Sequence, residues 1–164
     1  MTEIVQKYSN SVAAMNHLVA DAHVLWVKTH QAHWLMRSDK RSMNTFIPIH
    51  DYYDTYLDWL VSFIDDVAER VVQLNAVPIS TMKDMFNEAS ITEETIDYSD
   101  YTMDQFIKRT VDDFDLFYKE IRASINILDV ENDVGDSNKL QDYLSDVHKF
   151  IWFLNATLGE DVED

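Results

Sequence analysis

Residues 50–69 read HDYYDTYLDWLVSFIDDVAE, a run without glycine or proline. His50 and Asp54 are four residues apart at its start, and Asp65 and Glu69 are four residues apart near its end. In a helix each pair lies on one face, which is the arrangement that metal ligands need. The two pairs begin 15 residues apart, which is roughly 22 Å along a helix axis, so one ion cannot touch both. The stretch therefore predicts a helix that carries two separate half-sites.

The composition favours long helices in one domain. The chain has 164 residues, which predicts a single domain spanning residues 1–164 with a sizeable core. Hydrophobic residues make up 46% of it, too many for a disordered chain. Only two glycines and two prolines occur, few for a chain of strands and tight turns. Cysteine is absent, which excludes disulfides, thiolate metal sites and cysteine nucleophiles.

Charge and the N-terminal residues bear on location and partners. The formal net charge of -17 repels nucleic acid and anionic lipid and attracts cations, although solubility alone would also explain it. The first residues, MTEIVQKYSN, lack the basic start and apolar run of a signal peptide. No apolar run reaches the length of about 18 residues that spans a membrane. We therefore expect a cytoplasmic protein without a membrane partner.

Apolar residues recur at alternating steps of three and four in four long segments, residues 5–33, 49–74, 103–128 and 140–154. This spacing is typical of amphipathic helices. In the second segment the recurring residues are Ile49, Tyr53, Tyr56, Leu60, Phe63, Val67, Val71 and Leu74. The connection of roughly 25 residues after the second segment is long for adjacent antiparallel helices and predicts a crossover. The pattern as a whole predicts a four-helix bundle.

Helix ends are expected at residues whose chemistry favours caps and stops. The short stretch STMKDMFNEA, residues 80–89, predicts one further helix inside the crossover. The expected signals are Asn44 or Thr45 as a cap with Pro48 in the first turn of the second helix, Ser80 or Thr81 as the cap of the short helix, Gly135 as the break between the third and fourth long helices, and Gly159 as the end of the fourth.

The charged residues of the second segment gather on one side of the predicted helix. At about 100° per residue, they all fall within about 100° of His50. These carboxylates are Asp54, Asp58, Asp65 and Glu69. A solvated helix face is the ordinary explanation of such a stripe. Two features favour a covered metal site instead, because His33 lies on the apolar stripe of the first helix and large apolar residues flank the carboxylates. The flanking residues are Tyr53, Trp59, Leu60 and Phe63.

Imidazole and carboxylate groups without a thiolate suit iron, manganese or zinc. A di-iron site inside one bundle would need Glu-x-x-His motifs, and the chain contains none. Suppose instead that two copies of the second helix pack antiparallel about a two-fold axis near Trp59 and Leu60. The first half-site of one chain then lies beside the second half-site of the other, and the symmetry repeats the site. The spacing therefore predicts a site that is complete only in a dimer.

Four stretches together resemble a known family: THQAHWLMR (29–37), IHDYYD (49–54), DDVAERVVQLNAVPIST (65–81) and HKFIWFLNATLG (148–159). In this order and at these distances they are similar to the Dps and Dps-like peroxide-resistance proteins, the mini-ferritins. The resemblance implies an all-α, ferritin-like four-helix bundle with a short helix in the crossover between the second and third helices. It also implies a homo-oligomer, a hollow dodecamer with iron-oxidising sites at its two-fold interfaces.

The resemblance implies a ferroxidase whose substrates are Fe2+ and hydrogen peroxide and which stores Fe(III) mineral in its cage. Other divalent metals could occupy the same site. Carried over residue by residue, the implied iron ligands are His33, His50 and Asp54 of one subunit with Asp65 and Glu69 of its neighbour.

Aromatic residues near these ligands have two explanations. The resemblance implies that Trp34 lies beside the iron. Trp34 and either Tyr52 or Tyr53 could take up stray oxidising equivalents, and core packing explains the same rings equally well.

The chain departs from the family pattern in three places. Between His33 and His50 it has about five more residues than is usual, around SDKRSMN. The iron-entry pore of the family uses two aspartates, of which Asp129 matches one and Asn138 replaces the other, with Asp133 and Asp136 nearby. DNA-binding members carry a basic tail, whereas this chain starts with a single lysine in MTEIVQKYSN and ends in GEDVED.

Three functions thus compete at the level of sequence. An iron-oxidising and iron-storing cage is the leading interpretation. A DNA-compacting nucleoid protein of the same fold is the alternative, and the charge and the missing basic tail count against DNA binding. A helical bundle without metal chemistry, whose carboxylates only keep it in solution, is the third.

Overall fold

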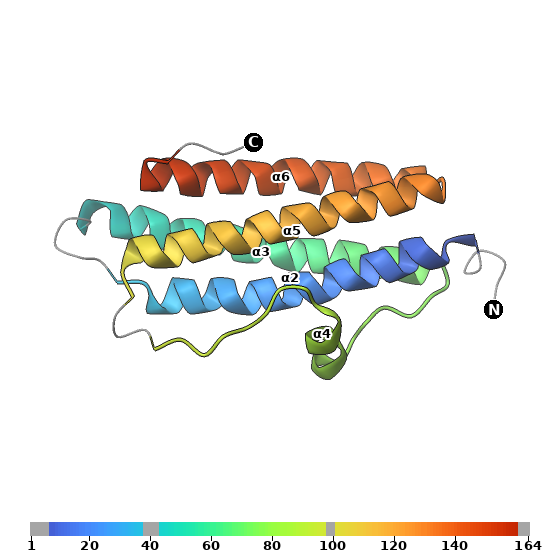
Figure 1. The fold of residues 1–164 in the computed structure, drawn as a ribbon, viewed down its shortest axis with the longest axis horizontal. Helices are drawn as coiled ribbons and strands as arrows, with labels where there is room; N and C mark the ends of the chain where they lie inside the picture. The colour runs from blue at the N-terminus through green and yellow to red at the C-terminus, as the bar shows by residue number, and fades with distance from the viewer. Residues whose placement is uncertain (1–6, 38–42, 98–100, 161–164) are drawn as a thin grey trace.

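The computed structural model describes residues 7–37, 43–97 and 101–160. Within these residues the regular structure is entirely helical, with α2 (Ser9–Leu35), α3 (Met43–Gln73), α4 (Met82–Glu88), α5 (Met103–Val130) and α6 (Val134–Leu158). Figure 1 shows the four long helices side by side and α4 on the flank of α2. The prediction of a four-helix bundle with a short crossover helix is confirmed. No helix in the described part of the chain is long and apolar enough to cross a membrane.

The crossover decides the direction of the helices. The connection after α3 returns along the length of the bundle before α5 begins, so α3 and α5 run in the same direction (Figure 1). This path carries the crossover past α2, where Asp21 and Lys28 bind its backbone. The crossover is therefore part of the packed structure along α2.

Aromatic rings fill the centre of the bundle. Tyr56 and Phe114 pack at a ring distance of 5.4 Å, and Phe150 from α6 packs on both. The buried Tyr53 hydroxyl donates to Thr110 Oγ at 2.8 Å, so its one polar group is satisfied. All apolar residues predicted on α3 are buried except Ile49, which is partly buried. The period-3.6 pattern thus identified the inner face of this helix.

Two helix ends match their expected signals, and a third has a cap that was not expected. Thr81 accepts a hydrogen bond from Asp84 N and caps α4, and Gly159 ends α6 with a left-handed φ of 75°. At the start of α5, Thr102 and Gln105 form a reciprocal capping box. These ends depend on local chemistry, which a sequence displays directly.

Two expected ends are wrong. The α3 helix begins at Met43, so Pro48 lies inside it, and Asn44 and Thr45 do not precede it. The missing N–H of proline costs a helix one internal hydrogen bond, which water can offset on an exposed face, and Pro48 is exposed.

The break between α5 and α6 also differs from the expectation. It comes before Gly135, which lies in the first turn of α6. Asn132 makes the turn with a φ of 58°, a left-handed conformation that asparagine tolerates. Val5, residues 38–42 of the long His33–His50 segment, and most of both chain ends lie outside the described residues.

Candidate metal centre

Three of the predicted ligands meet where α2 ends and α3 begins. His33 lies in the last turn of α2, and His50 and Asp54 lie one turn apart on α3. The His33 and His50 rings stack at a centroid distance of 3.9 Å, and His33 Nε2 lies 3.6 Å from Asp54 Oδ1. The structure thus brings together the three residues that were assigned to one subunit.

The hydrogen bonding of His33 sets its tautomer. Its Nδ1 lies 3.1 Å from the carbonyl oxygen of His50, which can only accept a hydrogen bond. Nδ1 therefore carries the proton, and the lone pair of the neutral ring is on Nε2, the atom that faces Asp54. Metal-binding histidines are commonly oriented by such a carbonyl contact, and the sequence pattern alone gives no sign of it.

The cluster is partly open to solvent. The side chain of His33 is 13% exposed and that of Asp54 is 65% exposed. His50 Nδ1 is buried and has no hydrogen-bond partner among the described residues. A cluster that contains an exposed carboxylate, and an imidazole nitrogen to which no described residue is hydrogen-bonded, suits the uptake of a cation.

The second half-site stays apart from the first within one chain. Asp65 and Glu69 are exposed on α3. Asp65 follows Asp54 by 11 residues on the same helix, roughly 16 Å along the axis. The two predicted half-sites therefore stay apart within a single chain, and the assignment of these residues as ligands stays a prediction.

The large apolar residues that flank the carboxylate stripe pack within the core of their own chain. Leu60 and Phe63 are fully buried, and Trp59 packs on Phe63 while its Nε1 donates to Asp146 at 3.0 Å. These residues do not show that the stripe is covered. Val61 is 53% exposed instead, and it lies within the stripe near its midpoint.

The aromatic candidates have different environments. Trp34 is 69% exposed, and its ring contacts His30 at 4.7 Å. Tyr52 packs on Tyr56 and Phe153. Tyr53 is buried and bonded to Thr110, which favours packing as its role.

The three pore candidates also differ in their exposure to solvent. Asp129 is exposed and accepts a hydrogen bond from Ser137 Oγ at 2.6 Å. Asp133 and Asp136 are buried, and Asp136 forms an ion pair with Arg70 of α3. Burial and the neighbouring Asp136 raise the pKa of Asp133. Asp129 alone of the three offers an exposed carboxylate, and the pore assignment stays a prediction.

Sequence reasoning missed one further cluster, which consists of His17, Asp21 and Glu120. The first two are four residues apart, a spacing that the sequence displays. The third comes from α5, and only the tertiary structure shows that it faces α2.

The chain is similar to known proteins in both sequence and fold. The family model for the ferritin-like domain matches residues 12–162. The DNA protection during starvation protein of Listeria innocua is 32% identical over 146 residues, which cover 89% of this chain and 90% of that protein. The chain belongs to the Dps proteins of the ferritin-like family. General stress protein 20U of Bacillus subtilis is 29% identical and covers 90% of this chain and 97% of its own length.

Solved Dps structures share the whole fold. The X-ray structure of Dps from Listeria monocytogenes superimposes with a TM-score of 0.85 at 31% identity, covering 92% of this chain and 94% of that chain. Dps from Listeria innocua soaked with cobalt gives a TM-score of 0.86 at 30% identity, covering 92% of this chain and 93% of that chain. This Dps chain therefore matches its relatives over nearly their full length.

Proposed function

We propose that this Dps chain assembles into a dodecameric cage that oxidises Fe(II), preferentially with hydrogen peroxide, and stores Fe(III) mineral. Its proposed iron ligands are His33, His50 and Asp54 of one subunit with Asp65 and Glu69 of its two-fold neighbour. The observation that carries the proposal is the clustering of His33, His50 and Asp54, while the two exposed carboxylates of Asp65 and Glu69 lie farther along α3 and cannot reach this cluster within one chain.

The donor set suits this oxidation. Two Fe(II) ions give up one electron each, and one hydrogen peroxide accepts both while its O–O bond breaks and two protons complete two water molecules. Anionic oxygen ligands favour Fe(III), the harder ion of higher charge. Two ions in one site can reduce peroxide by two electrons without releasing a hydroxyl radical. The role of the protein is to hold both ions at once.

Subunit mixing tests whether the site is shared. His50→Ala and Asp65→Ala should each slow peroxide-driven Fe(II) oxidation by roughly 100-fold, because each removes a ligand. When the two inactive proteins exchange subunits, half of the two-fold interfaces become mixed. Each mixed interface contains one site with both defects and one intact site. Activity should therefore return to roughly a quarter of the native value.

Asp58→Ala is the matched control, since Asp58 is an exposed carboxylate on the same stripe and belongs to neither half-site. It should oxidise Fe(II) at the native rate. If labelled subunits demonstrably exchange and the mixture stays inactive, the site lies within one chain and the shared site is wrong.

DNA compaction is the second candidate, because several relatives are named DNA protection during starvation proteins. We expect no binding to duplex DNA at neutral pH and moderate salt, because 13 Lys and Arg residues face 30 Asp and Glu residues. An electrophoretic mobility shift assay without added divalent metal checks this. A shift that weakens with salt would support the DNA-binding alternative.

A further inference from the structure

A second cluster of possible ligands lies between α2 and α5. His17 and Asp21 are one turn apart on α2, and Glu120 approaches from α5. His17 Nε2 lies 3.3 Å from Asp21 Oδ2 and 3.4 Å from Glu120 Oε2. One ligand atom from each residue lies within 4.8 Å of the other two. The cluster is far from the proposed iron site, because His33 follows His17 by 16 residues, roughly 24 Å along α2.

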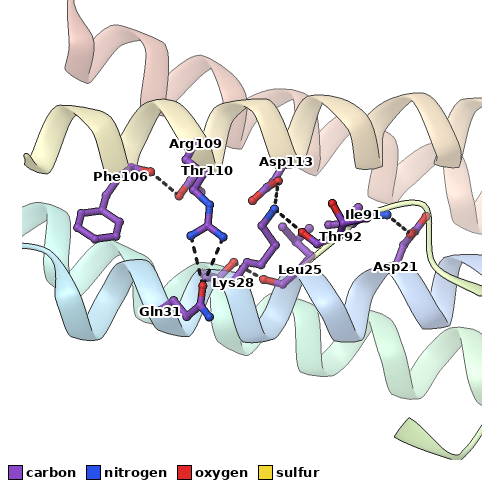
Figure 2. Close-up of polar contacts among 11 residues, drawn as sticks. Asp21, Leu25, Lys28, Gln31, Ile91, Thr92, Phe106, Arg109, Thr110 and Asp113 are labelled. Carbon is purple, nitrogen blue, oxygen red and sulfur yellow. Dashed lines mark hydrogen bonds and ion pairs between the residues drawn. The ribbon is translucent and has the colours of Figure 1, made fainter. Parts of the chain in front are cut away.

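The Asp21 carboxylate is fixed by hydrogen bonds from the backbone of the crossover. Its Oδ1 accepts hydrogen bonds from Ser90 N at 2.7 Å and from Ile91 N at 3.0 Å. Figure 2 shows Ile91 of the crossover donating to Asp21. Its other oxygen, Oδ2, is fully buried with the side chain and makes no hydrogen bond among the described residues. A fixed and unsatisfied carboxylate oxygen therefore faces His17.

Hydrogen bonding alone does not satisfy this cluster. Three oxygens surround His17 Nε2, because Ser90 Oγ lies at 3.1 Å in addition to the two carboxylates. A ring nitrogen carries at most one hydrogen and can donate it well to only one of them. A buried carboxylate oxygen without a hydrogen bond, such as Asp21 Oδ2, is costly. A cation among these atoms would satisfy the imidazole and both carboxylates together.

The separations fit a small divalent ion. Zinc binds histidine nitrogen and carboxylate oxygen at about 2.0–2.2 Å in tetrahedral geometry, which places neighbouring ligand atoms about 3.3–3.5 Å apart. The two distances from His17 Nε2 fall at this value. The side chains of His17 and Glu120 are 24% and 27% exposed, so water can reach the fourth position.

We propose that His17, Asp21 and Glu120 bind a zinc-type divalent ion in a site separate from the iron-oxidising one. The ion joins α2 to α5 directly. It also joins both helices to the crossover, because Asp21 holds the backbone of Ser90 and Ile91. The proposed role is structural: the ion fastens the crossover to the bundle and stabilises the folded chain by binding only that state.

Zinc titration by calorimetry tests this site. The full chain, stripped of metal with a chelator, carries His33→Ala and His50→Ala so that the proposed iron site does not contribute. This background protein should bind one zinc ion per chain at the second site. Adding His17→Ala or Glu120→Gln should weaken that binding roughly tenfold or more. Glu120→Gln keeps the size of a partly exposed side chain, so it tests the site even if His17→Ala disturbs folding.

His23→Ala is the matched control in the same background. His23 lies on α2, and its ring Nδ1 bonds to the carbonyl of Val19 in its own helix. It should leave the zinc stoichiometry unchanged, and zinc should raise the melting temperature of this control but not of the His17→Ala protein. Cobalt(II) should give the intense visible absorption of a four-coordinate ion that Glu120→Gln weakens. Equal zinc binding in all folded variants would overturn the proposal and leave His17 as an ion pair without a metal.

Discussion

At the scale of single residues, the buried cation Lys28 joins three parts of the fold. Its Nζ donates to Asp113 Oδ1 of α5 at 2.6 Å and to the carbonyl of Thr92 in the crossover at 2.9 Å (Figure 2). The Lys28 and Asp113 side chains are both largely buried. Burial raises the pKa of Asp113, and the neighbouring Lys28 only partly offsets this, so its pKa lies above the ordinary value. The pair is stable because each charge compensates the other.

Removing one charge of the Lys28–Asp113 pair should therefore destabilise the folded protein. Lys28→Met should lower the free energy of unfolding at pH 7 by about 3–5 kcal/mol, because it leaves the Asp113 carboxylate buried without its cation. The pKa of Asp113 should then rise further. When the pKa of a carboxyl group is higher in the folded state than in the unfolded state, the free energy of unfolding decreases as pH rises through the folded-state pKa. The cost of Lys28→Met should thus shrink on acidification as Asp113 takes up a proton.

Denaturant unfolding at fixed protein concentration, at pH 7 and pH 5, measures this cost. The double variant Lys28→Met/Asp113→Leu is the control, since replacing both charges with apolar groups should cost less than removing one. An equal cost of the single variant at both pH values would contradict the explanation based on Asp113.

At the scale of helices, the start of α2 is capped by a side chain from the end of α5. The N-cap residue of α2, Tyr8, makes no side-chain cap. Glu131 accepts from Asn10 N at 3.1 Å and from Ser11 N at 2.8 Å. Burial raises the pKa of Glu131, and the hydrogen bonds from Ser11 and Asn10 lower it by more, so the net pKa is below the ordinary value. The contact fastens the two helix ends to each other.

Glu131→Ala should lower the free energy of unfolding at pH 7 by about 1 kcal/mol, because it removes a cap and a negative charge at a helix N-terminus. A carboxylate with a lowered pKa contributes its stability above its unfolded value of 4.5. That contribution is lost as pH falls through the lower folded value. The native and variant proteins should therefore differ at pH 7 and converge in acid.

Thermal unfolding at the two pH values checks this prediction, together with hydrogen exchange at the Asn10 and Ser11 amides. Glu131→Gln is the control, since it keeps the shape and removes the charge, and it should cost less than alanine. Faster exchange of these amides should accompany the loss of stability. An unchanged rate of hydrogen exchange at these amides in Glu131→Ala would show that water replaces the Glu131 cap without loss of stability.

At the scale of the whole molecule, the exposed face of α3 combines carboxylates with valines. Val61 and Val72 are about half exposed, and both lie within the stripe that carries Asp54, Asp65 and Glu69. Exposed apolar groups beside exposed acidic groups suit a surface that another copy of the chain covers. The proposed two-fold contact therefore centres on Val61, since Trp59 and Leu60 face the core of their own bundle.

Val61→Lys should prevent this contact, because it places a flexible charge at the centre of the proposed interface. Light scattering should show species smaller than the proposed dodecamer, and fast Fe(II) oxidation should be lost although every proposed ligand is present. Val61→Ala keeps the position apolar and should preserve both assembly and oxidation. A dodecamer that forms with lysine at this position would move the two-fold contact elsewhere.

The sequence by itself determined the helices and their inner faces. The period of three and four placed Tyr53, Leu60 and Phe63 on one side of α3, and the same count placed His50 and Asp54 one turn apart. Such features depend on a fixed rotation and rise per residue, so a sequence displays them directly. It also displayed the length of the crossover, and hence the order of helices in the bundle.

Contacts between helices were decided only by the tertiary structure. A periodic pattern shows that a face is apolar but not which element covers it, so the pairing of Lys28 with Asp113 could not be predicted. The same holds for Glu120 beside His17, because a distance across two helices depends on how their side chains interlock. The break between α5 and α6 came at Asn132 and not at Gly135, because local hydrogen bonds from Asn132 N to Asp129 O and from Asp133 N to Leu128 O end α5 in a left-handed turn. Local rules therefore identified candidate ligands one helix turn apart, and packing alone brought His33 to Asp54.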